Sequence, residues 1–184
     1  MPQRLARARR EQRMRLTSRG SLSIIRNMGP GYVFVFAFGI GVVSGLRTML
    51  APAAVAWAVR LGWLNLHGSP VAFMESNLAL VGFSIAALGE LVADLLPFIP
   101  KRTDLAPLVA RMFSGGFCGA CLCASANRSL AIGAALGVAG AITGAFAGYE
   151  IRKRLVTKLR IKDFVVALSE DAIALGLALF FVSR

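Results

Sequence analysis

The sequence predicts an all-α, polytopic transmembrane helix bundle of about five spans, and three observations predict it. Of the 184 residues, 57% are hydrophobic, and the mean hydropathy is +0.67, whereas soluble domains are about 45–50% apolar by a count that also includes Gly. The length suits four or five spans of about 20 residues joined by short loops. The net charge of +12 is gathered in the N-terminal tail and two short loops, which membrane topology explains better than a basic globular face.

The first element is an Arg-rich tail, residues 1–30, ahead of a transmembrane domain at 31–184. Residues 1–28 contain one acid, Glu11. They contain eight arginines: Arg4, Arg7, Arg9, Arg10, Arg13, Arg15, Arg19 and Arg26. No apolar core of signal-peptide length precedes the first span, so the tail is not a cleaved secretory signal, although its composition also resembles an organelle transit peptide. The simpler interpretation is a cytoplasmic tail that binds anionic lipid. Nucleic acid, which clustered arginines can also bind, is not the expected partner.

Apolar runs then predict five spans, at about residues 32–59, 76–96, 105–124, 130–149 and 164–182. The first run is longer than the hydrocarbon core requires, so it either tilts or breaks near Gly45–Arg47 or at Pro52. The second run ends before a polar loop motif made of Pro97, Pro100, Arg102 and Asp104. A short turn at 127–129 follows the third run, and a basic segment separates the fourth run from the fifth.

The positive-inside rule orients these spans. With the N-terminus in the cytoplasm, the inside segments carry eight, two and six Lys and Arg residues, and the outside segments carry only Arg60, Arg128 and Arg184. We therefore expect a multi-pass protein of the cell inner membrane, with its N-terminus cytoplasmic and its C-terminus outside.

Several ionisable residues fall inside the predicted spans, at the midplane or on the cytoplasmic side. They are Arg47, Glu90, Asp94, Arg111, Glu170 and Asp171. Charges at bilayer depth are costly and rare, so they generally have a partner or a function. Glu90 and Asp94 are four residues apart and share one helix face, whereas the adjacent Glu170 and Asp171 point about 100° apart. In a single bundle these groups would converge on a polar site that opens toward the cytoplasm.

Two interpretations of these charges stay open. In the first, the two arginines and the carboxylates form ion pairs that fix the order of the helices, and removing one partner costs about 3–5 kcal/mol. In the second, they form a binding or proton-coupling site, because intramembrane carboxylates commonly carry protons or cations. Four carboxylates outnumber two arginines, which favours the second interpretation.

The leading hypothesis is therefore a transporter or channel for an ion or small solute. Arg47 would bind an anionic group or neutralise carboxylates, while Glu90 and Asp94 form the polar site. Asp171 would face that site from the last span. The alternative is a non-catalytic structural or accessory membrane subunit whose buried charges are ion pairs. We do not expect an enzyme: the two acids of the second span could act as acid and base on a lipid head group, but the sequence offers no nucleophile, metal motif or cofactor site beside them.

The fourth span carries glycines at spacings of four, three, four and four. They are Gly133, Gly137, Gly140, Gly144 and Gly148. Small residues at such spacing let helices approach closely. We expect this face to pack against the third span, within the chain or across a homo-oligomer. The small size of the chain also favours a homo-oligomer.

The three cysteines, Cys118, Cys121 and Cys123, lie in one apolar run. An odd count inside a span does not make a disulfide framework. Cys118-x-x-Cys121 matches half of a metal or redox motif, but the one histidine, His67, is remote in sequence. We expect polarizable packing residues and no metal.

Several of these segments together resemble a bacterial membrane family known as a domain of unknown function, DUF4126. They are Gly45–Arg47 with Pro52, the stretch from Gly89 to Asp104, Arg111–Gly115, the Gly-Ala run that ends at Tyr149, and 170–174. The likeness covers about residues 36–182, and the Gly-Glu…Asp…Pro…Pro-x-Arg stretch is its most specific part. Leu95 stands where the family has a lysine, which removes one ion-pair partner for Glu90 or Asp94. The resemblance implies a prokaryotic inner-membrane protein and supplies no activity.

Overall fold

The computed structural model describes residues 30–93, 105–159 and 163–183. The Arg-rich tail up to residue 29 lies outside the described residues. So do Asp94 and the whole loop motif of Pro97, Pro100, Arg102 and Asp104.

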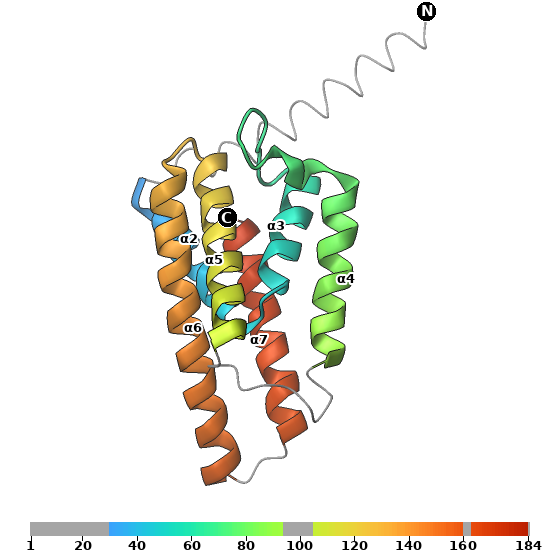
Figure 1. The fold of residues 1–184 in the computed structure, drawn as a ribbon, viewed down its shortest axis with the longest axis vertical. Coiled ribbons are helices and arrows are strands. Elements are labelled where there is room, and N and C mark those ends of the chain that lie inside the picture. Colours follow the sequence, from blue (N-terminus) through green and yellow to red (C-terminus); the bar gives the residue numbers. More distant parts are fainter. Residues whose placement is uncertain (1–29, 94–104, 160–162, 184) are drawn as a thin grey trace, which may run out of the picture.

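The described chain is helical, as the sequence predicts. Its elements are α2 (Pro30–Leu46), α3 (Leu50–Arg60), the 3-10 turn η1 (Ala72–Glu75), α4 (Asn77–Ala93), α5 (Leu105–Ser125), α6 (Leu130–Leu159) and α7 (Asp163–Ser183). They form one bundle in which α4 to α7 pass along its length (Figure 1). Two segments, Leu105–Ser125 and Leu130–Leu155, are long and apolar enough to cross a membrane, and α2, α3 and α4 are shorter apolar helices. The basic segment after residue 149 continues α6 as a helix to Leu159.

The first apolar run breaks where Gly45–Arg47 indicated. α2 ends at Leu46 and α3 begins at Leu50, which leaves three residues between them. Pro52 lies in the first turn of α3, where a missing N–H costs nothing, but its ring would clash with the carbonyl of Thr48 if the helix continued back through that residue. The Thr48 carbonyl instead accepts a hydrogen bond from the Ser114 hydroxyl, 2.5 Å away.

The two halves of this run also point in opposite directions. α2 runs parallel to α6, since Phe38 lies against Gly140 and Val42 lies against Gly144. α3 runs antiparallel to α4, because Met49 contacts Glu90 and Trp57 contacts Ser84. Residues 32–59 therefore form a helical hairpin instead of the single crossing expected from their length (Figure 1).

The hairpin determines at which end of the bundle the first and last described helices begin and end. The rings of Phe36 in α2 and Phe180 in α7 have centroids 6.3 Å apart, and those of Phe36 and Phe181 are 5.9 Å apart. The start of α2 and the end of α7 thus lie at the same end of the bundle. The sequence placed the two chain ends on opposite sides of five crossings, and the described helices differ because the first run turns back.

Glycines bring α2, α5 and α6 into direct backbone contact. A Cβ on Gly137 would overlap the backbone of Gly115 in α5, and one on Gly140 would overlap the backbone of Phe38 in α2. The same holds for Gly133 against Gly119 and for Gly144 against Val42. Gly148 is also buried. Helices α2 and α5 of the same chain therefore occupy the face formed by Gly133 to Gly144, so the homo-oligomer stays a prediction for which this face gives no support.

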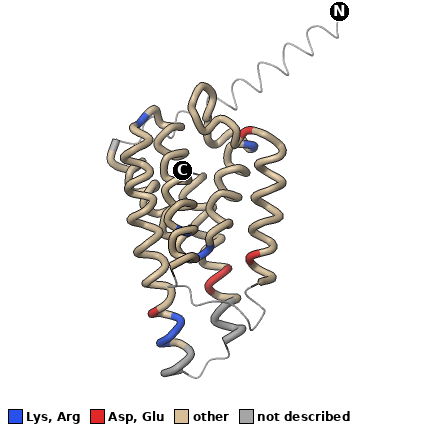
Figure 2. The backbone as a smooth tube through the Cα atoms, viewed as in Figure 1, with Lys and Arg blue, Asp and Glu red and all other residues tan. Residues whose placement is uncertain are grey.

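The outer surface of the bundle is apolar. Large exposed side chains on α4 and α5 include Leu78, Val81, Ile85, Leu88, Val92, Leu105, Val109 and Phe113. Helix α4 is peripheral: it packs mainly onto α3 and η1, and Ala87 is its buried residue. Charged positions gather near the upper loops and over the lower part of the bundle, while the helix surfaces between them carry almost none (Figure 2).

Candidate functional site

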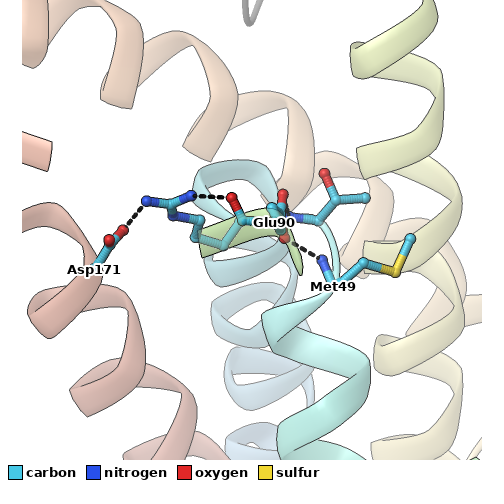
Figure 3. Close-up of polar contacts among 5 residues, drawn as sticks. Met49, Glu90 and Asp171 are labelled. Carbon is cyan, nitrogen blue, oxygen red and sulfur yellow. Dashed lines mark hydrogen bonds and ion pairs between the residues drawn. The ribbon is translucent and has the colours of Figure 1, made fainter. Parts of the chain in front are cut away.

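The break between α2 and α3 places free backbone groups inside the bundle. A helix start leaves N–H groups without intrahelical partners and carries a partial positive charge. At α3 the Glu90 carboxylate fills this need. One of its oxygens accepts from the Thr48 N–H and the other from the Met49 N–H, both at 2.7 Å (Figure 3). A side chain of α4 therefore closes the α3 start from 41–42 residues away in sequence.

Arg47 is the buried charge at the break, with 1% of its side chain exposed. Its backbone N–H still bonds to the Val43 carbonyl at 2.8 Å, which continues the α2 pattern by one residue. Its guanidinium forms an ion pair with Asp171 of α7 and makes a long 3.5 Å contact with the backbone carbonyl of Glu90 (Figure 3). Arg47 thus joins α7 to α4 through the tip of the hairpin.

Two serines tie α5 to both sides of the break. The Ser114 hydroxyl donates to the Thr48 carbonyl, and the buried Ser44 hydroxyl donates to the carbonyl of Arg111 at 3.0 Å. Non-helical backbone is tolerated at membrane depth only where protein satisfies it. Side chains from α4 and α5 satisfy the backbone of Thr48 and Met49, and Asp171 of α7 pairs with the side chain of Arg47.

The structure brings together three of the charged residues singled out from the sequence. Arg47, Glu90 and Asp171 meet at the break (Figure 3). Arg111 is buried one turn before Ser114 on α5, and its backbone carbonyl accepts the hydrogen bond from Ser44 of α2. Glu170 is half-buried beside Asp171 on α7. The Asp94 part of the predicted acid pair lies outside the described residues.

Sequence reasoning missed the polar residues that complete the site. Ser44, Thr48 and Ser114 all contribute to the contacts at the break. The first two flank Arg47 in an otherwise apolar run, and Ser114 lies one turn after Arg111. A hydroxyl within one turn of a buried arginine was the signal that could have found each of them.

The chemistry of the site is that of charge neutralisation. One guanidinium and the start of α3 supply positive charge, and the carboxylates of Glu90 and Asp171 oppose it. Among the described residues, no group of three or more His, Cys, Asp or Glu side chains could hold a metal ion. The thiols of Cys118, Cys121 and Cys123 are free and buried in α5, and a Cβ on Gly133 of α6 would overlap Cys123.

A model of one protein family matches most of the chain. It is described as a domain of unknown function (DUF4126), and the match covers residues 34–183. No curated protein and no solved structure matches the chain.

Proposed function

The chain belongs to the DUF4126 family, and on that premise we propose that it is a multi-pass protein of the cell inner membrane that transports an ion or a small solute. The transport site in this proposal is the charged break between α2 and α3, with Arg47, Glu90 and Asp171 as its central residues.

The apolar exterior supports the membrane part of the proposal. Two segments are long and apolar enough to cross a bilayer. Exposed side chains such as Leu78 and Phe113, with 84% and 82% of their surface exposed, are of the kind that lipid tails cover. A soluble protein rarely exposes contiguous apolar patches beyond a few hundred Å².

The observation that carries the transport proposal is the broken helix. The end of α2 and the start of α3 meet inside the bundle, beside Ser114 near the middle of α5. Discontinuous helices whose ends meet at mid-membrane are typical of ion and substrate sites in secondary transporters, because helix ends carry partial charges and free backbone groups. The three charged residues converge at that point.

Transport at this site would require an exchange of partners. The Thr48 and Met49 N–H groups already bind the Glu90 carboxylate, and Arg47 already pairs with Asp171. An anionic solute would replace the Glu90 carboxylate at the start of α3, whereas a cation would replace Arg47 at Asp171.

A ligand screen by thermal unfolding tests this function. Purified protein in detergent is heated with a panel of inorganic ions and small carboxylates, across pH, beside Glu90→Gln and Asp171→Asn. The matched control is Glu150→Gln, because Glu150 is an exposed carboxylate on α6 that forms an ion pair with Arg154, at 2.9 Å. We expect a ligand that raises the Tm of the wild type and of the control but not of the site variants. Equal responses in all four proteins would contradict the proposal.

The contacts at the break also favour a second function, a structural or accessory membrane subunit. Glu90 and Asp171 both bind partners within the chain and link α4 and α7 to the hairpin tip. Such a network stabilises the order of the helices without any ligand. This function predicts that neutralising Glu90 or Asp171 lowers the Tm and that no ligand in the panel shifts the Tm. It also predicts that the reconstituted protein carries no ion or solute across a membrane.

Two partners extend the proposal. In a homo-oligomer, several copies of the bundle would pack together around their sites. Native mass spectrometry in detergent tests this oligomeric state, and a monomer would be the contrary result. Anionic lipid would bind the Arg-rich tail, since basic segments gain affinity for acidic membranes. Vesicle binding with and without residues 1–29 tests this second partner, and equal binding of both forms would contradict it.

A further inference from the structure

The direction of α2 is fixed by its neighbours on two sides. Its contacts with α6 follow the same sequence direction in both helices, from Phe38 with Gly140 to Gly45 with Ala145, so the two helices are parallel. Its contacts with α7 follow opposite sequence directions in the two helices, from Phe36 with Phe181 to Arg47 with Asp171, so these helices are antiparallel. α2 therefore starts at the end of the bundle where α6 starts and α7 ends.

The direction of α3 is fixed by α4. Glu90, near the end of α4, binds Thr48 and Met49 just before α3. Ser84, nearly two turns earlier on α4, accepts from the Trp57 indole N–H at 3.1 Å. α3 therefore runs back from the break toward the start of α4, which is the end of the bundle where α2 began (Figure 1).

The lengths of the two helices agree with a turn inside the bilayer. α2 has 17 residues and α3 has 11, so at 1.5 Å per residue they measure about 25 Å and about 16 Å. The hydrocarbon core is about 30 Å thick. α3 is far shorter than that thickness, and α2 ends at the tip, which contacts Ser114 near the middle of the 21-residue α5.

We propose that α2 and α3 form a re-entrant hairpin that enters the bilayer and leaves it on the same face. The start of α2, the segment 61–76, the turn at 127–129 and the end of α7 lie on that face. The basic end of α6 lies on the opposite one. Four helices, α4 to α7, then cross the bilayer, and the charged tip at residues 47–49 lies inside it. This inference rests on the membrane embedding in the proposed function and adds the sidedness of its site.

The hairpin removes the basis for the orientation expected from charge. In the count by segments, the hairpin groups the eight arginines that precede α2 in sequence with Arg60, Arg128 and Arg184, eleven in all. It groups Lys101 and Arg102 with the six basic residues from 152 to 162, eight in all. The excess of sixteen over three depended on residues 32–59 crossing once, so the positive-inside rule no longer selects a side strongly.

Labelling of single cysteines from each side of the membrane tests the hairpin. The four variants are Gly31→Cys, His67→Cys, Ser129→Cys and Lys153→Cys, all at exposed positions. An impermeant maleimide is applied to intact cells and to inverted vesicles. The wild type, whose three cysteines are buried, gives the background. We expect positions 31, 67 and 129 to label from one side and position 153 to label from the other.

Each other outcome overturns a defined part of the proposal. Position 31 labelling with position 153, and opposite to 67, would show that residues 32–59 cross once, and it would overturn the hairpin while leaving the transport proposal intact. Labelling of all four positions from both sides, with release of the protein by alkaline carbonate, would show that the chain is not embedded. That result would overturn both proposals together.

Discussion

The bundle has two regions that are held together by different forces. The glycine-packed body consists of α2, α5 and α6, whose backbones touch at Gly41, Gly115, Gly137 and Gly144. The α3–α4 arm consists of α3, η1 and α4, and its outer helix packs mainly within the arm. In the body a Cβ at most of the contact glycines has no room, whereas a Cβ at Gly82 or Gly89 of α4 would meet nothing.

This difference indicates which part of the fold is rigid and which part can move. Repulsion between backbones in direct contact rises steeply as they approach each other, so the helices of the body can move little relative to one another. Within the arm, the Glu90 carboxylate near the break and the Trp57–Ser84 bond farther up join α4 to α3 and to the residues just before it. Because most of α3 is buried against α2, α5 and α7, α4 is the part of the arm that would move if the protein opens its site.

The largest effect is expected from Arg47→Leu, at the junction of the two regions. Its loss leaves Asp171 without the guanidinium that faces it, and breaking a buried pair from one side costs about 3–5 kcal/mol. The free energy of unfolding in detergent is the measurement. The double variant Arg47→Leu/Asp171→Leu is expected to recover part of that loss. Strict additivity of the two substitutions would show that the pair contributes nothing to stability.

The body is expected to respond next, through Gly137→Ala. The added methyl would overlap the Gly115 backbone, which cannot rotate away as a side chain can. Overpacking of a tight core costs about 1–3 kcal/mol. Thermal unfolding measures it, and an unchanged Tm would mean that α5 and α6 are not in backbone contact.

A smaller effect is expected from Glu90→Gln, and it should be confined to the arm. The amide keeps one acceptor where the carboxylate had two, so part of the cap at the start of α3 is lost, and losing a cap costs about 0.5–2 kcal/mol. Hydrogen exchange is the informative measurement. Faster exchange of α3 and α4 amides with unchanged α6 amides is expected, whereas uniform acceleration across all helices would contradict the division into two regions.

The smallest effect is expected from Gly82→Ala, with the opposite sign. Nothing lies within 4 Å of a Cβ at that position, and alanine is favoured over glycine in a helix by up to about 1 kcal/mol. The substitution should leave the Tm unchanged or raise it slightly. A fall as large as that of the Gly137 variant would place a packing partner against α4 that the structure of this chain does not contain.

The sequence predicted the helices well because long apolar runs and their polar interruptions are local signals. It also gave Gly45–Arg47 as one of two places where the first run could break if it did not tilt, since Gly45, Arg47 and Pro52 all disfavour a continuous apolar helix. The glycine spacing of the fourth run indicated close packing. The matching signal in the first run, Gly41-x-x-x-Gly45, was overlooked, and it is what admits α2 to the same contact.

The sequence could not predict that the first run turns back. A run of 28 residues is compatible with one crossing, and the reversal depends on contacts with distant segments. The cap on Thr48 and Met49 comes from Glu90 on another helix, and the pairing of Arg47 with Asp171 joins residues 124 apart. Nothing local distinguishes Asp171 from the other carboxylates as the partner of Arg47. The orientation expected from charge depends on the same point, because each side assignment followed from the number of crossings.

The most direct test of the central claim is flux across a sealed membrane. Wild type, Glu90→Gln, Asp171→Asn and the control Glu150→Gln are reconstituted into liposomes, and entry of protons, alkali cations, halides, phosphate and small carboxylates is followed. The account predicts flux of one of these species through the wild type and the control, and its loss in both site variants. Flux that is absent from all four proteins, or equal in all four, would contradict the claim that the charged break is a transport site.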